Sequence, residues 1–170
     1  MTSLTSDVTS GGGDGRAPEG LRSALGRRVV STESAEELGE LKAVVVDQPP
    51  RRIVSLQVAG SKRKPALVDW ADLSGFGPDA VMVRSEDALR GSADDVEAAA
   101  AKGQVSLLGA RVLDDAGDER GIVDDVLFDA ESGALVGITT AGDRGRGTAF
   151  AVADLLAFGS YALVVRAGST

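Results

Sequence analysis

The stretch Ala71-Asp72-Leu73-Ser74-Gly75-Phe76-Gly77-Pro78-Asp79-Ala80-Val81-Met82-Val83 decides the fold, because the chain contains a second version of it. The second version, Ala153-Asp154-Leu155-Leu156-Ala157-Phe158-Gly159-Ser160-Tyr161-Ala162-Leu163-Val164-Val165, follows 82 residues later. Matches continue upstream at the same offset (Gly39 with Gly121, Asp47 with Asp129, Ala59-Gly60 with Ala141-Gly142) and, before Gly39, at an offset of 83 (Leu25-Gly26 with Leu108-Gly109, Val29 with Val112). A repeated unit of about 60 residues predicts two small domains of similar structure.

Each copy is a series of short segments rich in β-branched residues and separated by turn residues. The predicted strands are 25–31, 41–47, 52–59, 66–70 and 80–83 in the first copy, and 110–114, 122–129, 135–140, 149–152 and 162–166 in the second. This spacing predicts a mainly β fold with two small β-barrels rather than a βαβ sheet. Residues 53–58 are apolar on both faces of the predicted strand, which indicates that the barrels pack against each other, related by a pseudo-two-fold axis.

The chain divides into four parts by composition. Residues 1–20 are mostly Ser, Thr, Gly and Asp and predict a disordered leader. Residues 21–84 and 108–170 are the two barrel-like domains, and 85–107 is a linker. The linker predicts a short helix, with Ser92 as its N-cap, Asp94 and Asp95 in its first turn and Lys102-Gly103 at its end.

Composition excludes many kinds of catalytic site. The chain has no Cys and no His, and it also has no Asn, so thiolate nucleophiles, zinc–thiolate sites and histidine general bases cannot be built from it. No stretch approaches the 18 apolar residues of a membrane-spanning helix, and no signal peptide precedes the first domain, so we expect a soluble, cytoplasmic protein. Abundant Ala, Gly, Arg and Asp fit a GC-rich bacterial genome.

Charge is distributed unevenly between the copies. Residues 85–170 carry a net charge of −8, whereas 20–84 carry +2 and 1–19 carry −2. Sister domains of opposite charge can attract each other or select different partners, although drift of a solvated surface explains the difference as well.

Glycine, aspartate and apolar strands recur in both copies in an order that resembles the PRC-barrel family. The residues that carry the resemblance in the first copy are Leu25-Gly26, Val29-Val30, 39–47, Ile53-Val54 and Ala71-Asp72-Leu73, and in the second Leu108-Gly109, Val112, 121–129, 135–138 and Ala153-Asp154-Leu155. The resemblance covers nearly everything except the leader and the linker.

The resemblance implies a binding module. PRC barrels occur in the H subunit of photosynthetic reaction centres, in a ribosome maturation factor, and in archaeal and bacterial adaptors, some of them in cell division. This chain lacks the transmembrane helix of the first and the separate N-terminal domain of the second. What the family implies here is therefore a non-enzymatic adaptor that binds a protein partner, with no catalytic residues, no metal and no cofactor. A homo-oligomer is left open.

Two basic loops at corresponding places suggest an alternative function. Lys62, Arg63 and Lys64 of the first copy align with a loop that carries Arg144 and Arg146, and each loop lies between two predicted strands. As hairpin tips, these side chains would meet a partner or the phosphates of RNA, which makes an RNA- or ribosome-associated factor the alternative. The competing interpretation is ordinary solubilising turn chemistry, and no aromatic residues accompany the charges to stack on bases.

The acidic residues favour structural roles over catalysis or metal binding. The run from Asp114 to Glu119 lacks the spacing of a calcium-binding loop and predicts a solvated turn. Asp124 and Asp125 are adjacent on a strand and so point to opposite faces, which makes a carboxylate-based enzyme a disfavoured third class. The repeated pairs Asp47/Asp129 and Asp72/Asp154 predict turns in which the carboxylate accepts backbone N–H groups, and Trp70 and Phe76 predict core or inter-barrel contacts.

Overall fold

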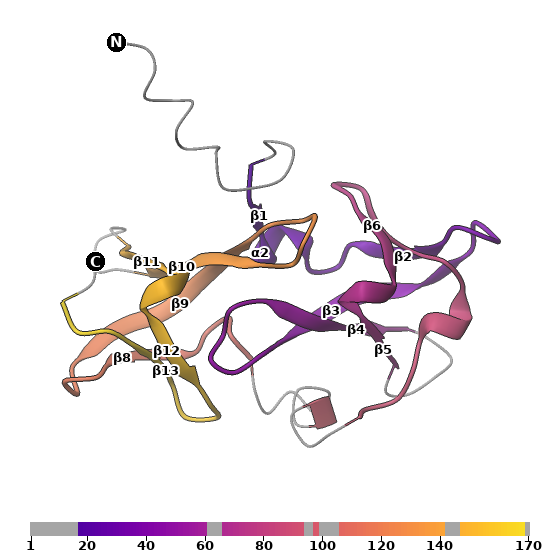
Figure 1. The fold of residues 1–170 in the computed structure, drawn as a ribbon. Coiled ribbons are helices and arrows are strands. Elements are labelled where there is room, and N and C mark those ends of the chain that lie inside the picture. Colours follow the sequence, from indigo (N-terminus) through magenta and orange to yellow (C-terminus); the bar gives the residue numbers. More distant parts are fainter. Residues whose placement is uncertain (1–16, 61–65, 94–96, 99–105, 142–146, 169–170) are drawn as a thin grey trace, which may run out of the picture.

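The computed structural model of the protein describes residues 17–60, 66–93, 97–98, 106–141 and 147–168. It contains two β-sheets, one from each sequence copy, which lie side by side (Figure 1). The mainly β fold expected from the sequence is confirmed. Among these residues, no helix has both the length and the apolar character needed to cross a bilayer.

The first sheet has six strands in the order β5-β4-β3-β2-β7-β6. Its strands are β2 (Arg28–Ser31), β3 (Glu37–Val46), β4 (Ile53–Ala59), β5 (Ala66–Asp69), β6 (Leu73–Phe76) and β7 (Ala80–Val83). A single 3-10 turn, η1 (Trp70–Asp72), joins β5 to β6, and a second, η2 (Glu86–Ala88), follows β7. Only β2 and β7 pair in parallel; the other neighbours are antiparallel.

The second sheet repeats this topology strand for strand, in the order β11-β10-β9-β8-β13-β12. Its strands are β8 (Arg111–Asp114), β9 (Glu119–Phe128), β10 (Leu135–Ala141), β11 (Ala149–Ala151), β12 (Leu155–Phe158) and β13 (Leu163–Val165), with the turn η4 (Val152–Asp154) before β12. Again one pair, β8 with β13, is parallel. Two copies of one sequence pattern have therefore folded alike, as the repeat predicts.

The predicted strands all exist, but each half has one more strand than expected. The predicted helical turns end at Asp72 and Asp154, and Leu73 and Leu155 already begin β6 and β12, which pair with β7 and β13. We expected one strand after the turn; the Phe-Gly motif is instead the bend of a hairpin, where the N–H of Gly77 donates to the carbonyl of Ala80 at 3.0 Å and that of Gly159 donates to Ala162 at 3.1 Å.

The start of the first half reaches across to the second. Glu19 and Gly20, which the sequence assigns to a disordered leader, form β1 (Glu19–Gly20) and pair with Phe128 and Leu127 of β9. A short helix, α2 (Leu21–Ala24), follows, and the backbone N–H of Arg22 donates to Asp125 at 2.9 Å. These contacts give the second sheet a seventh strand that belongs to the first half of the chain.

The two halves are related by a local two-fold axis that passes through one backbone bridge. Arg52 pairs with Ala134, its own counterpart 82 residues later. On either side, the N–H of Ile53 donates to the carbonyl of Gly133, and the N–H of Leu135 donates to the carbonyl of Arg51, both at 2.8 Å. Each of these bonds is the symmetry counterpart of the other, as in an isologous dimer interface, so the expected pseudo-two-fold relation is present in the main chain.

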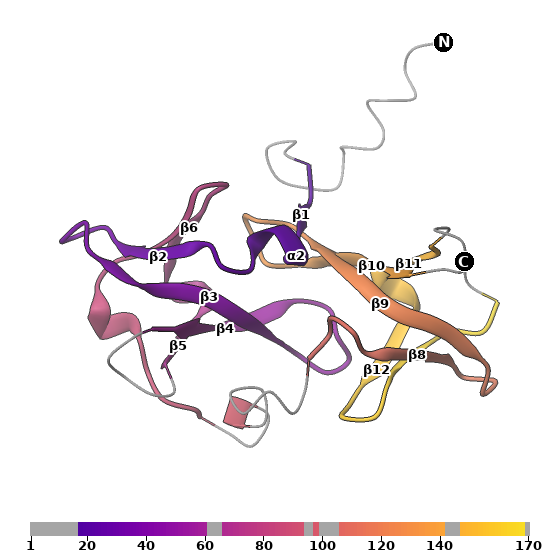
Figure 2. The same cartoon turned by 180° about the vertical axis from the view of Figure 1, so that it is seen from behind.

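Because of this axis, each of two hairpin loops lies against the opposite half of the protein. The loop between β3 and β4 extends into the second half, and the loop between β9 and β10 extends into the first (Figures 1 and 2). We call the contact of loop 47–52 with η4 and β12 the first junction, and the contact of loop 129–134 with η1 and β6 the second junction. Asp47 and Asp129 begin these loops, and their carboxylates accept backbone N–H groups of Arg51 at 2.7 Å and of Glu131 at 2.7 Å, as the sequence predicts.

One hydrophobic core extends through both halves. Its buried residues come from both sheets, and three aromatic side chains connect them where the halves meet. Phe76 stacks on Trp70 with ring centroids 5.4 Å apart, and Phe128 of the second half meets both rings edge-on, at 5.4 Å from Phe76 and 6.2 Å from Trp70. The prediction that Trp70 and Phe76 make core and inter-domain contacts is confirmed.

The linker covers the outer face of the first sheet. Leu67 of β5 and Arg90 exchange two backbone hydrogen bonds of 2.7 Å, and Glu97, which is 5% exposed, accepts a bond of 2.7 Å from the hydroxyl of Ser55 on β4. We expected the apolar faces of 53–58 to pack against the second barrel; Ile53, Leu56 and Val58 do belong to the core that includes the second half, whereas Ser55 is covered by Glu97 of the linker. Glu97 and residue 98 are helical, and most of the helix predicted from Ser92 to Gly103 lies outside the described residues.

Candidate interaction surfaces

The basic tips predicted as partner-binding residues cannot be placed. Lys62, Arg63 and Lys64 fall in residues 61–65, and Arg144 and Arg146 fall in residues 142–146, all outside the described residues. Their roles stay predictions from the sequence.

The acidic turn at 114–119 is held together by its first carboxylate. Asp114 accepts the backbone N–H groups of Ala116 at 3.0 Å and Asp118 at 2.9 Å, and Arg120 donates to its other oxygen at 3.3 Å. The hydrogen bond from Asp118 is the main cause that lowers the pKa of Asp114. The run is a turn, as expected, but Asp114 is buried rather than solvated, because its carboxylate replaces water as the acceptor for the turn. Among the described residues, no acidic cluster is arranged to hold a metal ion.

A second acidic pair, Asp124 and Asp125, contacts Arg22 of helix α2. Asp125 accepts the backbone N–H of Arg22, while Asp124 is an exposed partner of the Arg22 guanidinium at 3.2 Å. The two carboxylates act on different groups of one residue, and both contacts hold the two halves of the chain together.

The first junction is filled by polar side chains. Arg51 donates to the carbonyl oxygens of Val152 at 2.8 Å and Leu155 at 2.7 Å, at the end of η4. The amide of Gln48 accepts from the N–H of Phe158 at 3.1 Å and donates to the carbonyl of the same residue. The loop therefore binds the main chain of β12 with a guanidinium and a primary amide.

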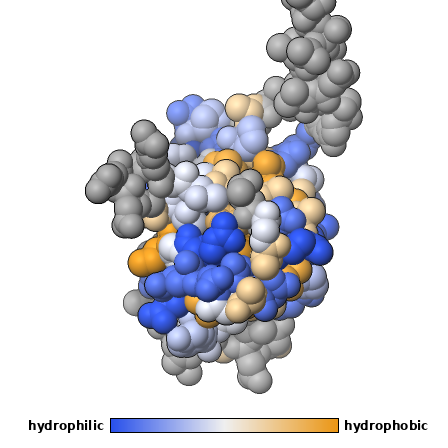
Figure 3. Space-filling view, turned by 90° about the vertical axis from the view of Figure 1, so that its left-hand side faces the viewer, coloured by the Kyte–Doolittle hydropathy of each residue, from blue (hydrophilic) through white to orange (hydrophobic). Residues whose placement is uncertain are grey.

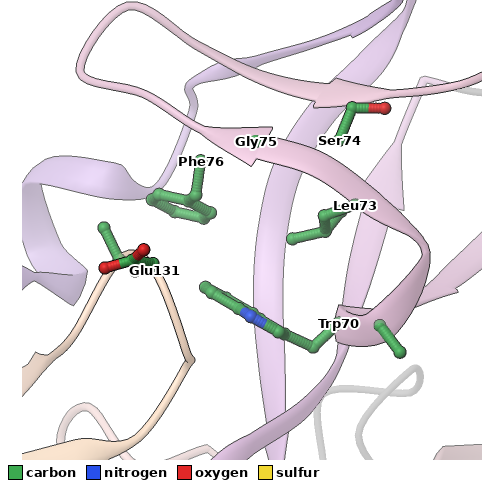
Figure 4. Close-up of a pocket in the computed structure, with 8 residues that line it drawn as sticks. Trp70, Leu73, Ser74, Gly75, Phe76 and Glu131 are labelled. Atoms are coloured by element: carbon green, nitrogen blue, oxygen red, sulfur yellow. The ribbon is translucent and has the colours of Figure 1, made fainter. Parts of the chain in front are cut away.

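The second junction has the same main chain and different side chains. Arg51 corresponds to Gly133, and Val152 corresponds to Trp70, so the indole ring takes the place of the guanidinium. Gln48 corresponds to Ala130, whose side chain cannot reach the main chain of Phe76. A pocket of about 410 Å³ is found here, lined by Trp70, Ala71, Leu73, Ser74, Gly75, Phe76, Ala130 and Glu131 (Figure 4).

We expect Gly133→Ala to lower the free energy of unfolding by about 2–3 kcal/mol. Gly133 has a φ of +79°, and a Cβ there would lie 2.8 Å from the Trp70 ring, so both backbone strain and overlap contribute. The matched control is Gly109→Ala, where φ is +82° but no heavy atom lies within 4 Å, so that only backbone strain remains. Denaturant titrations of both variants measure the difference; equal losses would show that the Trp70 contact is unimportant.

An exposed apolar patch lies on the second half and has no counterpart on the first. Tyr161 is 71% exposed and Ile122 is 51% exposed, and both line a shallow pocket of about 490 Å³ together with Arg111. The guanidinium of Arg111 lies over the Tyr161 ring, 5.3 Å from its centroid, and donates to the Tyr161 hydroxyl at 2.9 Å. We call Arg111, Ile122 and Tyr161 the apolar patch. Figure 3 views the second half end-on and shows hydrophilic side chains across its middle, with hydrophobic ones in smaller groups around them.

The repeat itself contained the signal for this patch. Ile122 corresponds to Glu40, and Tyr161 corresponds to Asp79, so two charged positions of the first copy are apolar in the second, while Arg111 keeps the arginine of Arg28. The residues that the two copies share do not indicate the patch; only the positions at which the copies differ do. An exposed Tyr beside an Arg is the composition typical of residues that dominate protein–protein binding energy.

The comparison with known families identifies the first half. Residues 19–89 match the family model of the PRC-barrel domain. The chain carries a PRC-barrel domain. The match begins at β1 and ends just after η2, so it includes the complete first sheet, and the second half repeats the strand order of this PRC barrel. No curated protein matches the chain.

Proposed function

We propose that this protein is a non-enzymatic adaptor of the cytoplasm that holds a partner protein on the apolar patch of its second PRC-type half. The presence of a PRC-barrel domain supports a protein-interaction role in general. The observation that carries the specific proposal is the asymmetry of the patch: at positions where the first half has Glu40 and Asp79, the second half exposes Ile122 and Tyr161. Isolated exposure of apolar groups is common, but two of them with an ordered Arg on one pocket favour a binding surface.

The acidic groups of the fold support a non-enzymatic function. The described carboxyl groups with a lowered pKa are Glu97 and Asp114, and each is held by an Arg and by backbone N–H groups inside the fold. Their pKa values are lowered by contacts that stabilise the charged carboxylate as a structural acceptor. A lowered pKa makes Glu97 and Asp114 unsuited to act as general acids.

The test converts the patch into its first-half counterpart. The double variant Ile122→Glu and Tyr161→Asp carries the residues that the same fold already accommodates in the first sheet, so it should fold normally. We expect it to capture the wild-type partner from an extract of the source cells at least about 30-fold less well, because loss of one dominant Tyr alone costs about 2 kcal/mol of binding. Val136→Glu is the control, since Val136 is 43% exposed but does not line this pocket. An unchanged set of captured proteins with the double variant would refute the proposal.

The alternative, an RNA- or ribosome-associated factor, rests on the basic tips alone. Changing Lys62, Arg63 and Lys64 to Glu should abolish salt-sensitive binding to polyanions if those residues contact phosphate. Absence of such binding by the wild-type protein at low salt would dismiss this alternative.

A further inference from the structure

We propose that the pocket of the second junction binds a loop of a partner protein that presents a glutamine side chain to the main chain of Phe76. This inference rests on the proposed adaptor function, but it concerns a site separate from the apolar patch. The first junction is the template for this inference, because loop 47–52 binds β12 there in the way that we propose for the partner at the second junction.

The first step of the argument is that Phe76 and Phe158 present their backbone groups in the same way. Phe158 pairs with Leu163 in the ladder of β12 and β13, and Phe76 pairs with Val81 in the ladder of β6 and β7. These are corresponding residues, in the same register, next to the same Phe-Gly bend. The N–H and C=O of Phe158 turn away from their own hairpin and bind the amide of Gln48. The N–H and C=O of Phe76 therefore turn toward the pocket.

The second step is that Phe76 has no counterpart of Gln48 among the described residues; the nearest basic side chain, Arg27, lies over the Phe76 ring and donates to the carbonyl of the next residue, Gly77, at 2.7 Å. Gln48 has been replaced by Ala130, and among the described residues no side chain forms a hydrogen bond with the main chain of Phe76. The pocket beside Phe76 and Ala130 lies where an amide equivalent to that of Gln48 would be. A donor and an acceptor at the edge of a sheet form hydrogen bonds with a partner that reaches them, and at Phe158 that partner is the side-chain amide of Gln48.

The third step concerns the walls of the pocket, which define the occupant. Figure 4 shows Trp70 and Phe76 on one side and Glu131 on the loop of the other half, while the Ser74 hydroxyl points away from the rings. Trp70 and Phe76 form a buried, rigid base of the pocket, and the exposed carboxylate of Glu131 favours a basic residue next to it. Loop 47–52 has this composition itself, since Gln48 is followed by Arg51 and Arg52.

The probe for the test is therefore a synthetic peptide with the sequence of residues 46–53. Trp70 is the only tryptophan of the chain, so its fluorescence reports directly on the pocket. We expect the peptide to change the Trp70 emission and to shift the backbone amide signal of Phe76 in the NMR spectrum. The amide of Phe158 should not move, because Gln48 already occupies it. A peptide with Glu in place of its Gln should bind at least about 10-fold more weakly, since it loses the N–H donor and adds a charge that Glu131 repels.

Two variants of the full chain complete the test. Ala130→Gln gives the protein the amide that the first junction has; it should shift the Phe76 amide signal without any peptide and lower peptide affinity at least about 10-fold. Gln48→Ala should open the first junction and make the Phe158 amide respond to the peptide. The double variant of the apolar patch should bind the peptide normally, so a failure of the proposed function and a failure of this site can be told apart.

The outcomes that overturn the proposal are also distinct. Equal peptide binding by wild type and Ala130→Gln, or a wild-type Phe76 signal that does not move at millimolar peptide, would exclude the site. If wild type is a dimer by light scattering and Ala130→Gln is a monomer, a second copy of this chain fills the pocket with its own loop, and the proposed partner protein is wrong.

Discussion

Replacing Phe128 with alanine is expected to lower the free energy of unfolding by about 3–5 kcal/mol, which is a large part of the stability of a protein of this size. Phe128 is fully buried and belongs to the second sheet, yet its ring meets Trp70 and Phe76 of the first. Its loss leaves a cavity between the halves that neither sheet can fill without moving relative to the other. Denaturant titration followed by circular dichroism measures the change.

A matched variant tests whether the halves share one core. Phe150 is equally buried, but it lies on β11 within the second half, where Arg120 packs over its ring at 5.3 Å. If the halves unfold as one unit, Phe150→Ala must shift the unfolding midpoint reported by Trp70, which lies in the first half. If the unfolding midpoint reported by Trp70 is the same in wild type and Phe150→Ala, the two halves are independently stable domains and the single core is wrong.

Glu97→Gln is expected to cost about 3 kcal/mol at neutral pH, because it removes the charge of a buried carboxylate that is paired with Arg90. Arg90 donates to both oxygens of the Glu97 carboxylate at 2.7 Å, and the backbone N–H of Ala93 and the hydroxyl of Ser55 supply further bonds of 2.7 Å. The variant leaves Asp69 as the remaining charge partner of the Arg90 guanidinium and weakens the attachment of the linker to the first sheet. Asp69→Asn is the control: Asp69 also binds Arg90, but its side chain is 45% exposed, so the loss should stay below about 1 kcal/mol.

The same carboxylate makes stability depend on pH in the acidic range. The hydrogen bonds from Arg90 lower the pKa of Glu97 from 4.5 to about 2. Because the pKa is lower in the folded state, the contribution of about 3 kcal/mol is present above pH 4.5 and is lost as the pH falls toward 2. The stability difference between wild type and Glu97→Gln should therefore shrink over this interval. A difference that stays constant from pH 5 to pH 2 would show that Glu97 is not the titrating group.

Local patterns explain why so much of the fold could be predicted. The repeat of Gly39 and Gly121, and of Asp47 and Asp129, marks bulges and turns that depend on the residue itself: Gly39 has a φ of +152° and would place a Cβ 2.3 Å from the carbonyl oxygen of Ala59. Alternation within β3 and β9 identifies strands by the same local rule. What these patterns did not indicate is which segment covers each face; Ser55 on β4 faces Glu97 of the linker rather than the sister sheet.

The sequence by itself determined the duplication, the places of the strands and turns, and the kinds of catalysis that a chain without Cys and His cannot perform, since each of these depends on residue type and spacing along the chain. Only the tertiary structure decided what the differences between the copies mean. In the sequence alone, the differences between Gln48 and Ala130 and between Arg51 and Gly133 look like ordinary loop variation. The two-fold axis through Arg52 and Ala134 carries each loop into the opposite half, so a change of side chain there either fills a junction or leaves a pocket.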